Sequence, residues 1–404
     1  MTSNAGNNNE IIIVAGEASG DMHGARLVTE MLKLRPGLNF RGVGGSYLRQ
    51  AGVDIMFPAE ELAVVGIAEV LSQLNVIRRA LKGIGQHLRR RSPALLILID
   101  FPDFNLILAA KAKKLGIPVF YYISPQVWAW RQGRVKTIAR RVTKLAVILP
   151  FEQEFFQRHG LRQVEFVGHP LVDQVNRPDR QAISDFRARH HIAPSCRLIG
   201  LLPGSRRKEI QAMLPIFLKT AALLKKRHRD IIFLLPLAPS LKQVDIDPLI
   251  AGTNLPLKII TEERYLLMAA SDLVMAASGT VTLELALLRT PMVVCYRLSA
   301  LTYFLGHRLI KAAFASLVNL VAGREIVKEL LQKEFTAPNL LEAVEDIWPG
   351  SAGNKRMRKE LAEVAASLGH QGASAKAARL AIATMEEGGG SYPLTQKVRE
   401  KSEY

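Results

Sequence analysis

Short apolar runs alternate with helix-like segments along the first part of the chain. The runs are continuous instead of alternating with polar residues, which is typical of strands buried on both faces of a parallel sheet. They cover residues 11–15, 94–99, 117–123, 145–149 and 164–167. Buried strands separated by helices predict one doubly wound, Rossmann-like α/β domain over residues 1–170.

A second series of apolar runs follows a polar stretch at residues 171–195, which we expect to be a linker. The runs cover residues 197–205, 231–237, 257–260, 272–277 and 291–297. They predict a second doubly wound, Rossmann-like domain over residues 196–350. Residues 351–385 are expected to form helices, with packing back on the first domain as one option, and residues 386–404 a flexible tail.

Two such domains in tandem place the carboxyl ends of their strands on the two sides of a cleft, where ligands bind. The first strand is followed by GEASGD, residues 16–21. The glycine spacing is not that of a dinucleotide site, and Ser19 or Asp21 could simply cap a helix. Glu17 is harder to explain in this way because it is a charge directly after a buried strand.

Two aspartates follow the strand at residues 94–99. Asp103 falls in the first turn of the next helix, where the helix dipole favours a carboxylate without any functional role. Asp100 lies at the strand end and faces the predicted cleft. Asp100 is therefore the better candidate for a general base.

The segment YYISPQVWAWRQGR, residues 121–134, combines aromatic side chains with arginines. Trp128 and Arg131 are placed by this pattern on a loop at the cleft. Contact with a sugar or a lipid and ordinary packing are both compatible with the sequence.

Two loops of the second domain suit a nucleoside diphosphate. Arg206 stands in LLPGSRRKEI at a helix start, where a bound anion would offset the clash of cations with the helix dipole. Ser278, Gly279 and Thr280 precede another helix, whose N–H groups can bind phosphate. Glu284, one turn further, suits the two hydroxyls of a ribose, although it could also be an ordinary surface charge.

The charge balance narrows the class of partner. Lys and Arg number 54 against 36 Asp and Glu, a formal charge of +18, which favours nucleic acid, an anionic membrane or phosphorylated substrates. Aromatic residues are only 6% and no basic recognition motif is present, which argues against nucleic acid. Cys196 and Cys295 form no disulfide framework, and a reducing cytosol fits best. No stretch has the length of a membrane span, so membrane contact is expected at the surface.

Asp245 and Asp247 match the DxD pattern of metal-dependent sugar transferases, but they lie in a polar connection. The sequence predicts a loop there and no metal site.

Together these motifs resemble the lipid-A-disaccharide synthase family. The matching pieces are GEASGD, ELAVVGIAEVL, DFPDFN, SPQVWAWR, GHPL, LLPGSR, ASGTVTLE and NLVAGREIVKELLQ, which span residues 16–332. The resemblance implies an inverting glycosyltransferase of the two-domain GT-B type without metal or other cofactor. It would join UDP-2,3-diacylglucosamine to 2,3-diacylglucosamine 1-phosphate, giving the lipid A disaccharide 1-phosphate and UDP.

The resemblance also implies roles for particular residues. Asp100 would be the general base. A UDP site would be lined by Arg206, Ser278, Gly279, Thr280, Glu284 and Asn319. Gly16, Glu17, Ser19 and Asp21 would lie across the cleft. One departure is visible, because Val318 stands where the family usually has proline.

A helical apolar stripe suggests where the chain meets its acylated substrates. It runs from Val64 to Leu88 at spacings of three and four, with Arg78, Lys82 and Arg89 along one edge. A core-facing helix would give the same pattern, and Gly83 and Gly85 weaken a single long helix. We expect the first part to contact an anionic membrane on the cytoplasmic face of the inner membrane. The expected membrane face consists of Val64, Val65, Ile67, Leu71 and Leu74.

Other functions stay open at this point. A transferase that adds N-acetylglucosamine to an undecaprenyl-linked peptidoglycan precursor would share the fold and the nucleotide site. A sugar-nucleotide epimerase would share the fold without needing a membrane-binding face. The assembly state is also open, with a homo-oligomer among the options.

Overall fold

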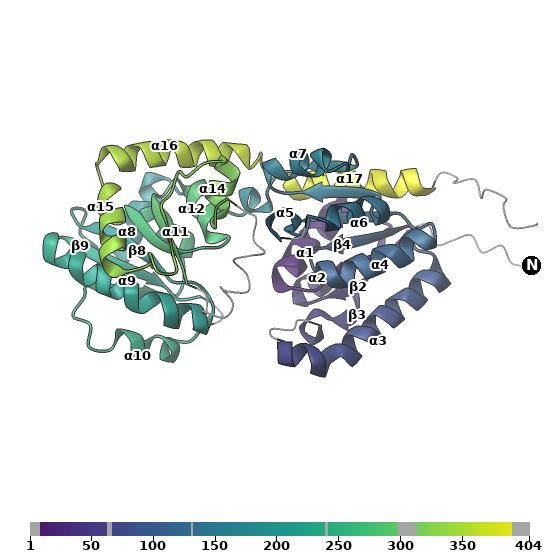
Figure 1. Cartoon of the computed structure of the whole chain (residues 1–404), viewed down its shortest axis with the longest axis horizontal. Coiled ribbons are helices and arrows are strands. Elements are labelled where there is room, and N and C mark those ends of the chain that lie inside the picture. Colours follow the sequence, from purple (N-terminus) through teal and green to yellow (C-terminus); the bar gives the residue numbers. More distant parts are fainter. Residues whose placement is uncertain (1–8, 63–66, 131, 239–240, 298–312, 390–404) are drawn as a thin grey trace, which may run out of the picture. The chain divides into compact units, whose positions relative to one another are not determined.

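The computed structural model describes residues 9–62, 67–130, 132–238, 241–297 and 313–389. It divides the chain into two compact units (Figure 1). Unit 1 comprises Met1–Pro170 and Gly372–Tyr404, and unit 2 comprises Leu171–Gln371. Each unit is built around its own parallel sheet.

The described part of unit 1 contains a parallel sheet in the order β3-β2-β1-β4-β5-β6-β7. Its strands are β1 (Glu10–Ala15), β2 (Asn39–Gly44), β3 (Asp54–Pro58), β4 (Leu95–Ile99), β5 (Val119–Tyr122), β6 (Lys144–Val147) and β7 (Val164–Phe166). The apolar runs predicted all of these except β2 and β3. The search for apolar runs missed both strands because they contain polar or glycine positions, and β3 is a partly exposed edge strand.

Helices cover both faces of this sheet (Figure 1). They are α1 (Ala18–Leu34), α2 (Ser46–Gln50), α3 (Ile67–Arg91), α4 (Pro102–Lys114), α5 (Val127–Trp130), α6 (Arg134–Arg141), α7 (Pro150–Arg158) and α17 (Ala373–Gly389). Ile12 and Val14 pack in one apolar cluster with residues of α3, α4 and α6, whereas Ile11 and Ile13 pack with residues of α1 and α17. Burial on both faces explains why the strands read as unbroken apolar runs.

Helix α3 is continuous through the two glycines that were expected to weaken it. A Cβ on Gly83 would lie 2.7 Å from the Phe57 ring, so the missing side chain lets the helix approach β3 closely. Ile84 and Leu88 are fully buried, which makes this end of the apolar stripe part of the core. None of the described helices is long and apolar enough to cross a membrane.

The expected membrane face lies outside what the structure describes. Val64 and Val65 are outside the described residues, and the side chains of Ile67, Leu71 and Leu74 are likewise not described, although their backbone belongs to α3.

The described part of unit 2 contains a parallel sheet in the order β10-β9-β8-β11-β12-β13. Its strands are β8 (Arg197–Leu202), β9 (Ile231–Pro236), β10 (Leu257–Ile260), β11 (Leu273–Ala277), β12 (Met292–Tyr296) and β13 (Glu329–Leu331). Its helices are α8 (Arg180–Arg189), α9 (Arg207–Arg227), α10 (Asp247–Ile250), α11 (Arg264–Ala270), α12 (Val281–Leu288), α14 (Leu317–Ala322), α15 (Ala337–Asp346) and α16 (Ala352–Ser367). The short strand β13 falls in none of the predicted apolar runs.

The C-terminal helices are divided between the units. Helix α16 belongs to unit 2, whereas α17 packs along α1 in unit 1, where it is the yellow helix of Figure 1. The interval expected as a linker belongs to unit 2, where α8 packs against α11. Helix α17 runs to Gly389, four residues into the expected tail, and residues 390–404 lie outside the described part.

The close pairing of β1 with β2 leads to a stability prediction. Gly42 has φ +153°, and a Cβ there would lie 1.8 Å from the Ile13 carbonyl oxygen. Gly52 also has a positive φ, +90°, but a Cβ there would meet nothing within 4 Å. We expect Gly52→Ala to cost about 1–2 kcal/mol through backbone strain alone and Gly42→Ala clearly more. Urea unfolding measures both, and equal losses would contradict this account of the β1–β2 contact.

Candidate active site

In unit 1 the strand order reverses between the neighbouring strands β1 and β4. Ala15 pairs with Ile99 at their carboxyl ends, so the loops beginning at Gly16 and Asp100 leave the sheet side by side. Such a reversal separates the following helices and is where open α/β sheets bind ligands. The topology therefore brings together Glu17 and Asp100, which were singled out in the sequence for separate reasons.

The backbone of Asp100 is held in an unusual conformation. Asp100 and the next residue, Phe101, have φ of +43° and +45°. The Asp100 carbonyl oxygen accepts hydrogen bonds from the Tyr121 hydroxyl at 2.6 Å and from Asn105 Nδ2 at 2.8 Å. Gly16 leaves room for the Phe101 ring, since a Cβ there would lie 2.4 Å from it. The surroundings thus maintain a strained strand end, a feature found often at functional sites.

The environment of Asp100 raises the pKa of its carboxyl group from 3.8 to about 6. Burial is the largest cause, the charge of Glu17 adds to it, and the Phe101 N–H opposes it. A carboxylate with a pKa near 6 is ionised at neutral pH and is more basic than an ordinary aspartate. These are the properties that a general base needs.

A cavity of about 360 Å³ adjoins Asp100. Its wall includes Ser124, Gln126, Arg134 and Glu152. Arg134 also donates to the exposed Asp103 carboxylate.

Glu152, which belongs to none of the sequence motifs, anchors the aromatic segment at residues 121–134 through hydrogen bonds. This buried carboxylate accepts from the Ser124 hydroxyl at 2.8 Å, from Trp128 Nε1 at 3.1 Å and from two backbone N–H groups. Trp128 itself is buried, with its ring edge-on to Phe151. Of the two roles considered for Trp128, its contacts are those of packing. Arg131 lies outside the described residues.

The remaining candidates of unit 1 differ in exposure. Glu17 and Ser19 are exposed at the start of α1. Asp21 is buried, and its carboxylate accepts from the backbone N–H groups of Gly45, Tyr47 and Leu48. Asp21 therefore caps the short helix α2.

In unit 2 the strand order reverses between β8 and β11, and a cavity of about 580 Å³ lies at their carboxyl ends. Arg206 from the loop after β8 and Ser278, Gly279, Thr280 and Glu284 after β11 all line this cavity. Five of the six residues predicted for a nucleotide site therefore meet in one hollow.

The residues 278–280 lead directly into α12. The Ser278 N–H donates to the Cys295 carbonyl oxygen, and the Ser278 hydroxyl donates to the Ala315 carbonyl oxygen. These two hydrogen bonds tie the loop to its neighbours. A Cβ on Gly279 would meet nothing within 4 Å, so the backbone here borders open space. A helix N-terminus in such a position can bind an anion.

Arg206 extends from the start of α9 with 82% of its side chain exposed. The clash of cations with the helix dipole that we inferred from the sequence is already relieved by Glu209. Its carboxylate accepts from the N–H groups of Ser205 and Arg206 at 3.2 Å each. Gly204, with φ +111°, lets the loop pass close to Glu209. The Arg206 guanidinium is left at the cavity wall.

Glu284 is almost buried, with 6% exposure, and is not an ordinary surface charge. The Arg264 guanidinium donates to its Oε1, and the Tyr265 hydroxyl lies 3.5 Å from the same oxygen. Burial raises the pKa of the Glu284 carboxyl, and Arg264 opposes that rise. Arg264 could not be found from the sequence, because it lies 20 positions before Glu284 and belongs to no motif.

Asn319 is the predicted residue that does not line this cavity. It is fully buried, its Oδ1 accepts from the N–H groups of Ile326 and Val327, and its Nδ2 donates to the Glu329 carboxylate. Its side chain ties α14 to β13. Val318, which replaces the usual proline, lies in the first turn of α14, where both residues are tolerated.

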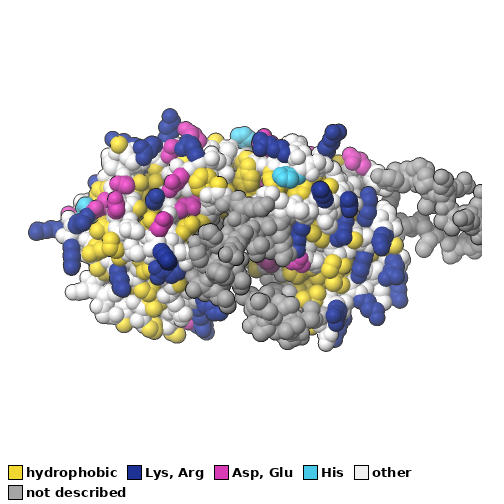
Figure 2. All heavy atoms as spheres, viewed as in Figure 1, with side chains coloured by type: hydrophobic (Ala, Val, Ile, Leu, Met, Phe, Trp, Pro, Cys, Tyr) yellow, Lys and Arg dark blue, Asp and Glu magenta, His cyan; other side chains and the backbone are white. Residues whose placement is uncertain are grey.

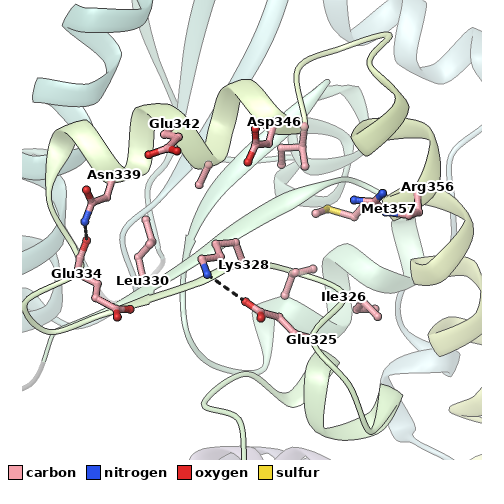
Figure 3. A pocket seen from close by; sticks show the side chains of 13 residues that line it. Glu325, Ile326, Lys328, Leu330, Glu334, Asn339, Glu342, Asp346, Arg356 and Met357 are labelled. Carbon is pink, nitrogen blue, oxygen red and sulfur yellow. Dashed lines mark hydrogen bonds and ion pairs between the residues drawn. The ribbon is translucent and has the colours of Figure 1, made fainter.

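A different hollow of about 570 Å³ lies beside β13, α15 and α16 (Figure 3). Its rim carries acidic side chains, of which Glu325 pairs with Lys328 at 3.6 Å. None of the predicted site residues lines it. The loop predicted for Asp245 and Asp247 is wrong, because Asp245 ends a short 3-10 helix, Gln243–Asp245, and Asp247 begins α10. Asp245 is paired with Arg207 at 3.0 Å.

Solved structures share the architecture at low sequence identity. UDP-GlcNAc 2-epimerase from Neisseria meningitidis, bound to UDP-GlcNAc, is 13% identical, with a TM-score of 0.61 over 94% of this chain and 100% of that one. The calicheamicin glycosyltransferase CalG4 is 14% identical, with a TM-score of 0.59 over 95% of this chain and 99% of that one. These similarities confirm the predicted fold of two doubly wound domains.

Sequence relatives are much closer. Lipid-A-disaccharide synthase from Geobacter sulfurreducens is 46% identical over 95% of this chain and 98% of its own length. The enzymes of that name from Nitrosococcus oceani and Myxococcus xanthus are 43% and 41% identical over 93% and 94% of this chain and 96% and 98% of their own lengths. The family model described as lipid-A-disaccharide synthetase matches residues 11–383. The chain therefore belongs to the lipid-A-disaccharide synthase family.

Proposed function

We propose that this chain transfers the diacylglucosamine unit of UDP-2,3-diacylglucosamine to 2,3-diacylglucosamine 1-phosphate, releasing UDP and the lipid A disaccharide 1-phosphate. One observation carries the assignment: relatives that align with nearly the whole chain bear the name of this activity. The peptidoglycan-precursor alternative is not favoured by these names.

The donor nucleotide is assigned to the cavity of unit 2. The N–H groups ahead of α12 and the Arg206 guanidinium suit a diphosphate, and the Glu284 carboxylate suits the two ribose hydroxyls. As the glycosidic bond to UDP breaks, negative charge grows on the departing diphosphate. The N–H groups and Arg206 stabilise that charge without a metal in this mechanism.

The acceptor is assigned to unit 1, where Asp100 acts as the general base. Its carboxylate takes the proton from the attacking sugar hydroxyl as the new bond forms through an oxocarbenium-like transition state, with inversion at the anomeric carbon. The pKa near 6 suits this role because the group is ionised at neutral pH. The strained backbone at Asp100 fixes the direction from which the base approaches.

A membrane-facing surface is the remaining part of the proposal, because both substrates carry acyl chains. Between residues 70 and 151 the sequence has 15 Lys or Arg and two acidic residues. Helices α3, α4 and α6 pack side by side, and Figure 2 shows Lys and Arg gathering over the region of α3 and α4. The basic face consists of the exposed residues Arg78, Arg79, Lys82, Arg89, Arg90, Arg91, Lys113, Lys114, Lys136 and Arg140. The apolar side chain of Ile107, 43% exposed, lies on α4 beside it.

The reaction is tested by mass spectrometry of the products formed from the two acylated substrates. We expect one disaccharide 1-phosphate and one UDP per turnover. UDP-N-acetylglucosamine with an undecaprenyl-linked acceptor serves as the comparison, and turnover of that pair alone would replace the assignment with the alternative.

Asp100→Asn should nearly abolish turnover, since an amide cannot accept the proton, and should leave UDP binding in unit 2 intact. For the wild type, kcat/KM should rise about tenfold per pH unit below pH 6 and level off above it, because only the ionised base is active. Asp103→Asn is the matched control and should keep both activity and pH profile. Wild-type turnover in the Asp100 variant would remove this residue from the mechanism.

Reversing two charges on the basic face, with Arg90→Glu and Lys114→Glu together, should weaken binding to vesicles that contain phosphatidylglycerol. Each lost cation contributes about 1 kcal/mol near an anionic surface, so the loss should reach at least tenfold. Vesicle flotation measures it, with Lys226→Glu and Arg229→Glu in unit 2 as the control pair. Unchanged flotation, or equal loss in the control, would place the membrane contact elsewhere.

A further inference from the structure

One ion pair on the wall of the unit 2 cavity joins Glu284 to Arg264, a residue that belongs to none of the motifs described above. Arg264 opens α11 and Glu284 lies on α12, and these two helices pack together. The Arg264 guanidinium donates to Glu284 Oε1 and, at 3.1 Å, to the Tyr265 hydroxyl. The guanidinium also lies over the Tyr265 ring, 4.7 Å from its centroid. The arginine is thus fixed in place from two sides.

The contact leaves the two oxygens of Glu284 in different situations. Oε1 is the oxygen that meets Arg264 and Tyr265. Within the described residues no side chain or backbone group donates to Oε2, although Glu284 lines the cavity. Arg264 thus holds one oxygen of the carboxylate, and the second oxygen remains available to a ligand.

We propose that Arg264 is a positioning residue that holds Glu284 as an oriented anion, so that Glu284 Oε2 accepts from the ribose 2′-hydroxyl of the bound nucleotide. The inference rests on the proposed assignment of UDP to this cavity and names the residue that makes the ribose contact selective. Arg264 acts through Glu284 and does not itself contact the nucleotide.

Burial explains why Glu284 needs such a partner. Burial raises the pKa of the Glu284 carboxyl, whereas the Arg264 charge and the hydrogen bonds from Arg264 and Tyr265 lower it. Without the arginine, protonation would begin at a higher pH. A protonated carboxyl group loses acceptor capacity and binds a diol less well.

The other groups around Glu284 do not replace Arg264. The cavity wall also carries Arg206, Glu209, Glu262, Glu263 and Tyr296. Arg206 pairs with Glu209 at 3.7 Å, and Glu263 pairs with Arg189. Among the helices packed on α12, α14 has no titratable side chain, and Arg358 of α16 donates to the carbonyls of Arg289 and Asp272.

The test is calorimetric binding of UDP and 2′-deoxy-UDP to the full-length protein at pH 8 and pH 6. The ratio of the two dissociation constants isolates the ribose contact, since the phosphates of both nucleotides titrate alike. For the wild type we expect a ratio of about tenfold or more, the worth of one hydrogen bond to a charged group. Glu284→Gln should reduce this ratio strongly.

Arg264→Gln should lower the ratio at both pH values, and more at pH 6 than at pH 8, because protonation of Glu284 increases as the pH falls. Arg227→Gln is the matched control, since Arg227 also pairs with a glutamate, Glu345, is similarly exposed and lies outside the cavity. It removes the same charge and should behave as wild type. Arg264→Lys keeps the positive charge and should restore a ratio that varies little with pH. A thermal melt on each variant verifies that it is folded.

The outcomes separate this inference from the proposed function. If the wild type binds UDP without discriminating against 2′-deoxy-UDP, the ribose assignment itself is wrong. If the wild type discriminates and Arg264→Gln keeps the full ratio at both pH values, the positioning role alone is overturned. If Arg264→Gln weakens both nucleotides equally, Arg264 binds the nucleotide directly, which also overturns the inference.

Discussion

The reversal of strand order in each parallel sheet is the constraint on which both candidate sites depend. On either side of the reversal the connecting helices pack on opposite faces, so the loops after the two central strands diverge and leave a crevice. In unit 1 these strands are β1 and β4, and in unit 2 they are β8 and β11. Residues separated by about 80 positions, such as Glu17 and Asp100 or Arg206 and Glu284, become neighbours for this reason alone.

Carboxylates around these crevices do different work according to their partners. Asp21, Glu152 and Glu209 accept several hydrogen bonds each and hold neighbouring segments of backbone in place. Glu284 has an arginine on one oxygen and lines the cavity. Asp100 has burial and the like charge of Glu17 as its main influences, which raise its pKa. The same functional group thus serves as a cap, an oriented acceptor or a base.

Rigid supports surround the two residues that are proposed to act on substrates. Buried Tyr121 and Asn105 hold the carbonyl of Asp100 at the end of β4, while Gly16 makes space for the Phe101 ring. Arg264 is stacked on Tyr265 while it holds Glu284. Side chains fixed in this way need no large rearrangement when a ligand arrives, which favours transition-state stabilisation. The strained φ angles at Asp100 and Phe101 are compatible with the fold because the surrounding sheet and helices maintain them.

Continuous apolar runs were enough to predict two doubly wound domains, because a strand buried on both faces leaves no polar positions. Local composition also singled out Asp100, Arg206 and residues 278–280 as candidates, since polar residues directly after buried strands have few structural explanations, and Glu284 as a candidate one turn further on. Only the tertiary structure revealed the strands β2, β3 and β13, because their mixed composition shows no clear periodicity of apolar residues. It also showed that α17 packs in unit 1. The tertiary structure alone showed that the side chains of Asp21, Trp128 and Asn319 make internal contacts. It also showed that Arg264 and Glu152 bind residues of the two candidate sites. Those roles arise from contacts between distant segments, and such contacts leave no periodic signal in the sequence.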